Sequence, residues 1–194
     1  MAGRAGRVAT VRIVAGSAKG VRLAPVPPGV RPVSDVAREG LFSSLGDRVA
    51  GARVLDLYAG TGALGIEALS RGAASAVFVE RARRAVRTIR DNLERTRLAS
   101  RAVVRAGDVV RFVMSDDKSI GPFDLCLLDP PYETGADELG RVLSALASGW
   151  LAPGGWRVAL TRGSRSSTPV IPVDWRVTRR LEYGDTLVLV CSEV

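Results

Sequence analysis

Four consecutive residues in the second half of the chain combine an acid, two prolines and an aromatic ring: Asp129-Pro130-Pro131-Tyr132. They follow an apolar run at residues 123–128 that is typical of a buried strand. The two prolines fix the backbone and remove two N–H donors. We expect the Asp129 carboxylate and the Pro130 carbonyl to accept both protons of an aromatic amine, which localises its lone pair for attack, while Tyr132 stacks on the ring. A rigid turn with a partly buried tyrosine is the alternative interpretation.

The chain contains no histidine. Nucleophilic sites of the Ser-His-Asp or Cys-His type and His-ligated metal centres are therefore excluded. The chemistry must need little proton shuttling at neutral pH, and we expect no metal. Methyl transfer from a sulfonium meets this condition, because the sulfonium is already a good leaving group and positioning with electrostatics supplies most of the catalysis.

A glycine-rich segment, residues 54–65, has the sequence VLDLYAGTGALG and predicts a strand, a tight turn and the start of a helix. Its glycines also satisfy the G-x-G-x-x-G pattern of nicotinamide and flavin sites. Asp56 distinguishes the two kinds of site, because a carboxylate at this strand end would repel a dinucleotide pyrophosphate. The same carboxylate attracts the ammonium and sulfonium of S-adenosylmethionine or orders water around them. We therefore predict S-adenosylmethionine as the cofactor, with Gly60 and Gly62 allowing the backbone to approach it closely.

Two more acids follow predicted strands further along the chain. Glu80 ends the next apolar run, twenty positions after Gly60, where an acid can accept hydrogen bonds from both ribose hydroxyls. Asp108 follows the third run, where it can accept from the adenine amino group. The alternatives are a solvated strand-end acid for Glu80 and a helix N-cap for Asp108. The predicted cofactor contacts are Asp56, Tyr58, Gly60, Gly62, Glu80 and Asp108.

Short apolar runs alternate with segments of helical period after Gly51. The expected strands cover residues 54–57, 76–80, 102–105, 123–129 and 156–160, then 175–182 and 186–190 around a tight turn. A helix near residues 82–98 is expected to turn inward Ala82, Ala85, Val86, Ile89 and Leu93. The pattern predicts an α/β fold, a Rossmann-like and mostly parallel seven-stranded sheet closed by an antiparallel C-terminal hairpin, which is the plan of the class I methyltransferases.

The first fifty residues form a separate predicted unit. Residues 1–10 lack periodicity and predict a flexible basic tail. Residues 11–50 predict a small appendage with a hairpin of residues 11–14 and 21–24, a Pro-rich connector through Pro32, and a helix from the N-cap Ser34 to about residue 45. The apolar face of that helix is expected to contain Val36, Ala37, Leu41 and Leu45. Residues 51–194 form the predicted methyltransferase domain.

Positive charge is concentrated in the first part of the chain: residues 1–50 and 51–110 each carry a net +5, and residues 111–194 carry −2. A polyanion such as RNA or DNA fits this asymmetry, although arginine-rich composition and solvated helix faces also produce it. The predicted contacts with substrate RNA are Arg12, Lys19, Arg22 and Arg31. No apolar run suggests a membrane span or an export signal, and Cys126 and Cys191 lie in predicted strands. We expect a cytoplasmic monomer without a disulfide.

From Arg12 to about Val190 the sequence resembles the bacterial 16S rRNA guanine-N2 methyltransferases of the RsmD type. The matching segments are Arg12-Ile13-Val14-Ala15-Gly16 with Gly20, Arg31-Pro32, Arg38-Glu39, Leu41-Phe42, the DLYAGTGALG loop, Phe78-Val79-Glu80, Asp129-Pro130-Pro131-Tyr132 and Tyr183-Gly184-Asp185-Thr186. The resemblance implies a class I methyltransferase fold, S-adenosylmethionine as methyl donor, and a guanine of 16S rRNA in a small-subunit particle as acceptor. It assigns cofactor binding to Asp56, Gly60, Gly62 and Glu80, and catalysis to Asp129 and Tyr132. Val33, Val36 and Ser43 depart from the family pattern, and all three lie in the appendage.

Three other functions are compatible with parts of the sequence. A DNA adenine-N6 methyltransferase uses the same kind of tetrapeptide, but the chain has no segment long enough for a domain that reads DNA sequence. A protein-glutamine methyltransferase usually has Asn before Pro-Pro-Tyr, where this chain has Asp129. A catalytically silent RNA-binding module would not need the acids Asp129 and Glu80.

Overall fold

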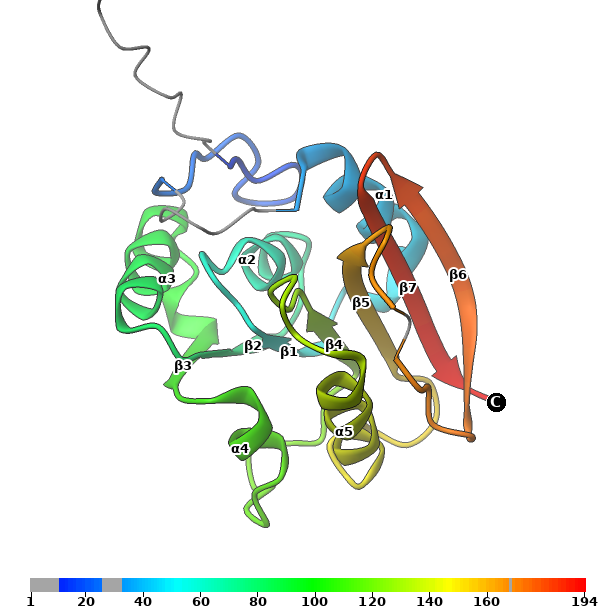
Figure 1. Cartoon of the computed structure of the whole chain (residues 1–194). Helices are drawn as coiled ribbons and strands as arrows, with labels where there is room; N and C mark the ends of the chain where they lie inside the picture. Colours follow the sequence, from blue (N-terminus) through cyan, green and yellow to red (C-terminus); the bar gives the residue numbers. More distant parts are fainter. Residues whose placement is uncertain (1–10, 26–32, 168) are drawn as a thin grey trace, which may run out of the picture.

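The computed structural model describes residues 11–25, 33–167 and 169–194. The predicted basic tail, much of the predicted connector and the predicted RNA contact Arg31 lie outside these ranges. The described chain forms one seven-stranded sheet in the order β3-β2-β1-β4-β5-β7-β6 (Figure 1). The strands are β1 (Arg53–Leu57), β2 (Ser75–Glu80), β3 (Ala102–Ala106), β4 (Leu125–Leu128), β5 (Arg157–Gly163), β6 (Trp175–Tyr183) and β7 (Thr186–Glu193).

Strands β1 to β5 are parallel, and β7 pairs antiparallel with both β5 and β6. This arrangement confirms the predicted mostly parallel sheet with an antiparallel C-terminal hairpin. The predicted strand bounds were less accurate at β5, which continues three residues beyond the predicted end to Gly163 because it also pairs with β7. The longer β5 brings Thr161 and Arg162 into the sheet.

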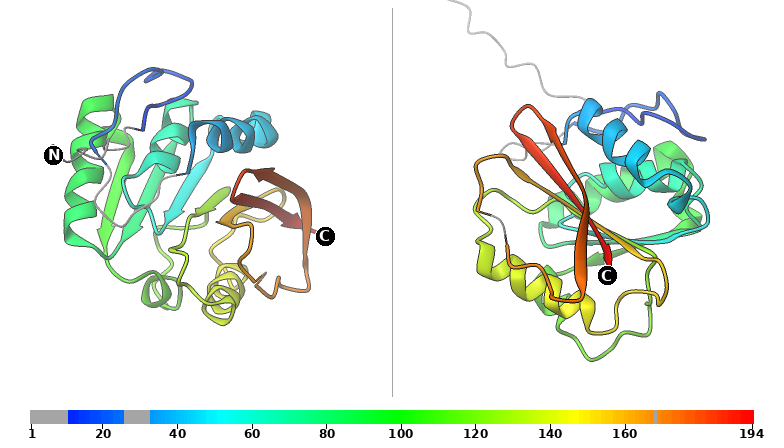
Figure 2. Two further views of the ribbon diagram at one scale, coloured as in Figure 1. Left: turned by 45° about the horizontal axis from the view of Figure 1, so that its top comes forward. Right: turned by 90° about the vertical axis from the view of Figure 1, so that its right-hand side faces the viewer.

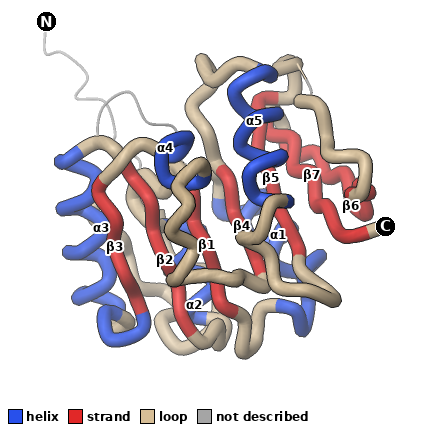
Figure 3. The backbone as a smooth tube through the Cα atoms, turned by 90° about the horizontal axis from the view of Figure 1, so that it is seen from below, coloured by secondary structure: helices blue, strands red, loops and turns tan. Residues whose placement is uncertain are grey.

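Within the described ranges, five α-helices cover the two faces of the sheet: α1 (Asp35–Leu45), α2 (Ala63–Ser70), α3 (Arg83–Thr96), α4 (Val109–Val113) and α5 (Ala136–Ala147). Helices α1, α2 and α3 share one hydrophobic cluster with Val54 and Leu127 of the sheet. Helices α4 and α5 pack in a second cluster with Leu55 and Leu128 on the opposite face (Figure 3). Neighbouring strand residues thus face opposite clusters, which explains why the central strand β4 is apolar throughout.

Helix α1 begins after the predicted N-cap Ser34, whose hydroxyl accepts a hydrogen bond from the amide of Ala37 at 3.2 Å. Its predicted apolar face was wrong at Val36, which is 64% exposed. Arg38 and Phe42 are buried in its place. Arg38 can be buried because its guanidinium donates to the carbonyls of Val33 and Arg12 and to the carboxylate of Asp35.

Helix α3 presents the predicted inward face with one exception. Ala85, Val86, Ile89 and Leu93 are buried, as predicted. Ala82 is exposed, because it is the N-cap residue with extended backbone and precedes the first turn.

The N-terminal segment, residues 11–25, lies across α2 and α3 on one side of the molecule (Figure 2). The predicted hairpin is present as a short one, with an antiparallel bridge between Arg12 and Arg22. Its backbone hydrogen bonds run from the amide of Leu23 to the carbonyl of Val11 at 2.8 Å, from Ile13 to Val21 at 3.0 Å and from Gly20 to Ile13 at 2.9 Å. Val11, Ile13 and Leu23 are buried in the same hydrophobic cluster as α2. The segment is therefore fixed both by its own backbone hydrogen bonds and by packing on the helices.

Glu67 of α2 is the main polar contact of the N-terminal segment. Its side chain is fully buried, and its two carboxylate oxygens accept hydrogen bonds from the amides of Val14 at 2.8 Å and Ala15 at 3.0 Å. Arg71, one turn later, forms an ion pair with it at 2.7 Å. Gly16 is needed at the next position, because a Cβ there would lie 1.8 Å from the carbonyl oxygen of Ser70. At Gly16 the segment thus approaches α2 more closely than any residue with a Cβ would allow.

Both cysteines are buried and unpaired, in agreement with the prediction of reduced core residues. Burial raises the pKa of both thiols, that of Cys191 to about 11. Among the helices of the described ranges, none combines the length and the apolar character that crossing a membrane requires.

We predict that Glu67→Ala destabilises the fold and loosens the N-terminal segment. The substitution leaves two partly buried amides without an acceptor and Arg71 without its partner, so the free energy of unfolding should fall by about 2–5 kcal/mol. Chemical denaturation measures the loss, and hydrogen exchange should accelerate at the amides of Val14 and Ala15. Glu94→Ala, on the exposed face of α3, is the matched control. Equal unfolding free energies for the two variants would contradict this role of Glu67.

Candidate functional site

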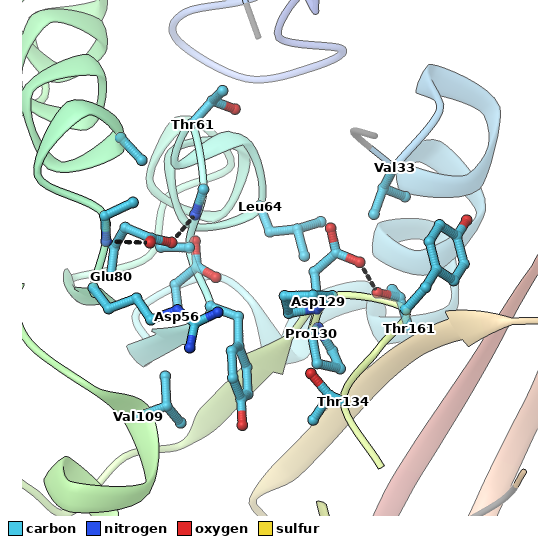
Figure 4. Close-up of a pocket in the computed structure, with 18 of the residues that line it drawn as sticks. Val33, Asp56, Thr61, Leu64, Glu80, Val109, Asp129, Pro130, Thr134 and Thr161 are labelled. Atoms are coloured by element: carbon cyan, nitrogen blue, oxygen red, sulfur yellow. Dashed lines mark hydrogen bonds between the residues drawn. The ribbon is translucent and has the colours of Figure 1, made fainter. Parts of the chain in front are cut away.

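A cavity of about 600 Å³ opens at the carboxyl ends of β1, β2, β4 and β5 (Figure 4). Eight of the predicted site residues line it: Asp56, Tyr58, Gly60, Glu80, Asp108, Asp129, Pro130 and Tyr132. Gly62 does not line the cavity. It faces the core, where a Cβ on this residue would lie 3.2 Å from Ile66 and 3.3 Å from Ile89. Gly62 instead caps the start of α2 with a φ of 79°, a conformation that glycine adopts without strain.

Asp56 of β1 connects this strand to helix α2 by a hydrogen bond. Its Oδ2 accepts a hydrogen bond from the amide of Gly65 at 2.9 Å, in the first turn of the helix. Gly65 cannot carry a side chain, since a Cβ would lie 2.3 Å from the ring of Phe78 and 2.9 Å from Oδ2 of Asp56. The third glycine of the pattern therefore allows helix and strand to pack closely.

The other oxygen of the Asp56 carboxylate, Oδ1, is buried and has no hydrogen-bond partner among the described residues. Burial is the largest cause that raises the pKa of Asp56 well above its usual range, and the nearby charges of Asp129 and Glu80 raise it further. A buried acid with an unused acceptor in a cavity wall favours a cationic ligand. Within the described ranges, no group of three or more His, Cys, Asp or Glu side chains is arranged to hold a metal ion.

Glu80 ends β2 and is fixed by two backbone amides. Its Oε2 accepts from Gly60 at 2.9 Å, and its Oε1 accepts from Ala82 at 2.8 Å (Figure 4). A carboxylate oxygen has lone pairs for two acceptor contacts, so both oxygens can still accept from a ligand in the cavity. The structure thus gives Glu80 a defined orientation at the strand end, where a freely solvated acid would have none.

Tyr58 and Asp108 line the cavity on the side of α4 and α5. The Tyr58 hydroxyl donates to Glu138 of α5 at 3.3 Å, and burial together with this acid raises the pKa of the phenol. Asp108 is the N-cap of α4, where Oδ1 accepts from the amide of Arg111 at 3.0 Å. The two interpretations of Asp108 are therefore compatible, because the residue caps a helix and also faces the cavity.

Asp129 follows β4, and its Oδ1 accepts a hydrogen bond from the hydroxyl of Thr161 in β5 (Figure 4). Burial raises the pKa of Asp129 to about 6, and the bond from Thr161 acts in the opposite direction. None of the described residues donates a hydrogen bond to the carbonyl of Pro130. The acid and this carbonyl therefore both have acceptor capacity left for hydrogen bonds from a ligand, and their predicted role in catalysis stays a prediction.

Tyr132 is 51% exposed at the rim of the cavity, where a stacking residue must be accessible. Its ring packs on Gly163 at the end of β5, so closely that a Cβ on Gly163 would lie 2.7 Å from Cε1 of the ring. The neighbouring Arg162 is buried and donates to the carbonyl of Thr134 at 2.9 Å, which fixes the loop after Tyr132. The end of β5 thus supports the loop that carries the tyrosine.

The sequence analysis missed Thr161, Arg162 and Gly163. They lie in β5, and the register pairs Leu128 of β4 with Leu160 of β5, so the next residues on each strand lie side by side. Thr161 could not be predicted from the sequence, because it belongs to no motif and lies more than eighty residues after the predicted cofactor loop. Only the strand order and register place it in the site.

The predicted RNA contacts that the structure describes lie outside the cavity. Arg12, Lys19 and Arg22 are exposed on the N-terminal segment, and Arg12 also forms an ion pair with Asp35 at 3.1 Å. Arg84, in the first turn of α3, is exposed and lines the cavity together with Arg81. Basic residues are therefore present both at the rim of the cavity and on the N-terminal segment.

Comparison with known proteins gives consistent results across nearly the whole chain. The family model described as Conserved hypothetical protein 95 matches residues 11–192. The ribosomal RNA small subunit methyltransferase D of Escherichia coli strain K12 is 33% identical over 177 residues, which cover 90% of this chain and 85% of that protein.

Solved structures agree with these matches. The yhhF protein of Escherichia coli superposes with a TM-score of 0.80 at 32% identity over 95% of this chain and 98% of that one. A protein from Thermus thermophilus superposes with a TM-score of 0.79 at 34% identity over 95% and 99% of the two chains. The seven-stranded sheet is that of a class I methyltransferase, and the chain belongs to the Conserved hypothetical protein 95 family, which is the family of the RsmD-type methyltransferases.

Proposed function

We propose that the protein transfers a methyl group from S-adenosylmethionine to the exocyclic N2 of a guanine in 16S rRNA of the small ribosomal subunit. The observation that carries the proposal is the position of Asp129, an acid next to a free carbonyl, in the same cavity as the unpartnered oxygen of Asp56. Family membership supports methyl transfer, and the name of the Escherichia coli relative supports rRNA as the acceptor.

The cavity residues fit the parts of S-adenosylmethionine in the order of the strands. Glu80 at the end of β2 has acceptors for the ribose hydroxyls, and Asp108 after β3 has a second oxygen for the adenine amino group. Asp56 at the end of β1 offers its unpartnered oxygen to the methionine ammonium, either directly or through water. The cofactor contributes an activated methyl group on a good leaving group.

Asp129, Pro130 and Tyr132 act on the acceptor. With a pKa near 6, the Asp129 carboxyl is mostly ionised above neutral pH and accepts one proton of the amine. The Pro130 carbonyl accepts a hydrogen bond from the second N–H, which the methylated product keeps, and the lone pair of the nitrogen then points away from the ring plane toward the methyl group. Tyr132, exposed at the rim, stacks on a base that has been turned out of its helix.

The N-terminal segment is the proposed RNA-binding surface. Lys19 and Arg22 are exposed on it, and residues 1–50 carry a net +5. Phosphate contacts by such residues fix the register of an RNA, while an unpaired base enters the catalytic pocket. Removing residues 1–32 would not isolate this role, because Val11, Ile13 and Leu23 belong to the hydrophobic core. Substitutions of exposed side chains test it without unfolding the chain.

We predict that a strain lacking this protein loses one N2-methylguanosine from 16S rRNA. Wild-type protein should restore it, and Asp129→Ala should not, because the amine then loses its charged proton acceptor. Mass mapping of digested rRNA identifies the nucleotide. Asp137→Ala, on the first turn of α5, is the control and should restore methylation. Full restoration by Asp129→Ala, or loss of a different kind of methylated nucleotide, would overturn the proposed mechanism or the proposed substrate.

We predict that Glu80→Ala weakens binding of S-adenosylmethionine about ten- to a hundred-fold, since a charged acceptor for two hydroxyls is lost. Isothermal titration calorimetry measures the affinity. Glu133→Ala makes the same change of charge at the exposed rim of the cavity and should bind within about twofold of the wild type. If both variants lose the same affinity, general charge in the cavity, and not a hydroxyl contact at Glu80, determines binding.

We predict that the double substitution Lys19→Ala with Arg22→Ala weakens RNA binding and lowers its salt dependence. Each lost phosphate contact reduces the slope of log K against log salt by about one, so the slope should fall by about two. Filter binding to 16S rRNA at several salt concentrations measures it. Arg141→Ala with Arg179→Ala removes the same charge from α5 and β6 and serves as the control. Equal slopes for the two double variants would show that the N-terminal segment does not contact phosphates.

A further inference from the structure

The end of β5 provides the sole protein hydrogen bond to the Asp129 carboxylate among the side chains that the structure describes. The hydroxyl of Thr161 donates to Oδ1 of Asp129. No element of the tetrapeptide itself fixes this carboxylate, because the prolines that follow have no N–H groups. The orientation of Asp129 therefore depends on the neighbouring strand.

The position of Thr161 is well determined by the sheet. Its side chain is 1% exposed, and β5 pairs with β4 on one side and with β7 on the other. Thr161 itself is opposite Val188 of β7. A β-branched residue in such a strand has little freedom at χ1, so its hydroxyl is fixed in space.

The Thr161 hydroxyl has one hydrogen and two acceptors within reach. One is Oδ1 of Asp129, and the other is the carbonyl of Leu128 at 3.3 Å. A bond to an ionised carboxylate is about twice as strong as a bond to a neutral carbonyl, so the ionised form of Asp129 takes the hydrogen. When Asp129 is protonated, the hydroxyl can instead donate to Leu128 and accept from Asp129.

We propose that Thr161 is a positioning residue for methyl transfer, whose hydroxyl keeps the Asp129 carboxylate ionised near neutral pH and turns its Oδ2 toward the acceptor amine. The inference rests on the proposed role of Asp129 and adds the residue that enables it. The direction of the effect agrees with the environment of Asp129, where burial raises its pKa and the Thr161 bond lowers it.

Other ionisable side chains face the same cavity and contribute to the electrostatic environment of Asp129. Asp56 of β1 interacts with Asp129, since the charge of Asp129 raises the pKa of Asp56. The remaining ionisable side chains in the cavity wall are Tyr58, Glu80, Arg81, Arg84, Asp108, Tyr132, Glu133, Glu138 and Arg162. All of them are retained in a Thr161 variant, so a change in the titration of Asp129 is attributable to the lost hydroxyl.

The test compares Thr161→Val, which preserves shape and removes the hydroxyl, with Thr161→Ser, which restores it. For wild-type protein, kcat should fall at acid pH as Asp129 is protonated. In Thr161→Val the midpoint of this fall should move upward by about one pH unit, because a hydrogen bond to the charged form is lost. The loss of turnover should therefore be about fivefold near pH 6 and smaller at higher pH. Thr161→Ser should return the midpoint to within a few tenths of a unit.

Two measurements separate this effect from a general structural one. The ¹³C chemical shift of the Asp129 carboxyl, assigned by its absence in Asp129→Asn, reports the titration directly and without substrate. Thr178→Val removes a hydroxyl on β6 that donates to the carbonyl of Val190 on β7 at 3.0 Å, and should leave the pH profile unchanged. Thermal unfolding of each variant confirms that it is folded at the assay temperature.

The outcomes distinguish this inference from the proposed function. If Asp129→Ala keeps wild-type turnover, the proposed role of Asp129 is wrong, whatever the effect of Thr161. If Asp129→Ala is inactive while Thr161→Val retains both the wild-type pH profile and the wild-type carboxyl titration, Asp129 is catalytic and the role of Thr161 is overturned. An upward shift in Thr161→Val that Thr161→Ser does not reverse also contradicts it, because the hydroxyl would then not be the cause.

Discussion

The parallel pairing of β4 with β1 on one side and β5 on the other is the constraint on which the site depends. Parallel strands end at the same edge of a sheet, so their terminal residues meet even when they are far apart in sequence. This edge collects Asp56, Glu80, Asp129 and Thr161 from four strands. The helices on the two faces bury nearly all of the central strands β1, β4 and β5, which fixes the register and with it the position of the acids at their ends.

Bringing several acids to one partly buried edge has an electrostatic cost. The pKa of Asp56 is raised by burial and by its acidic neighbours, and that of Asp129 is raised by burial. Backbone amides offset part of this cost: Gly65 donates to Asp56, and Gly60 and Ala82 donate to Glu80. The unpartnered oxygen of Asp56 shows that the compensation within the protein is incomplete. A cationic cofactor would complete it, so binding and stability are expected to be coupled.

The sequence alone was sufficient to predict the site residues that belong to local motifs. The glycine loop, the strand-end acids and the tetrapeptide were found because each combines a strand with an unusual residue at its end. Three kinds of residue could not be found in this way. Thr161 depends on the pairing of β4 with β5. Arg38 and Glu67 are buried with the help of backbone groups from the N-terminal segment, and Gly62 faces the core although it belongs to the glycine motif. In all three cases the position is determined by contacts with residues far away in the sequence, and the periodicity of the sequence carries no information about such contacts.

A crystal structure of the protein with S-adenosylhomocysteine, the product of the cofactor, tests most directly the claim that this edge is a methyl-transfer site. The account predicts that both ribose hydroxyls donate to Glu80, that the amino group of the ligand lies near Oδ1 of Asp56, and that the sulfur faces Asp129 across the space where an amine can enter. A ligand bound elsewhere, or bound in the cavity with its sulfur turned away from Asp129, would contradict the account.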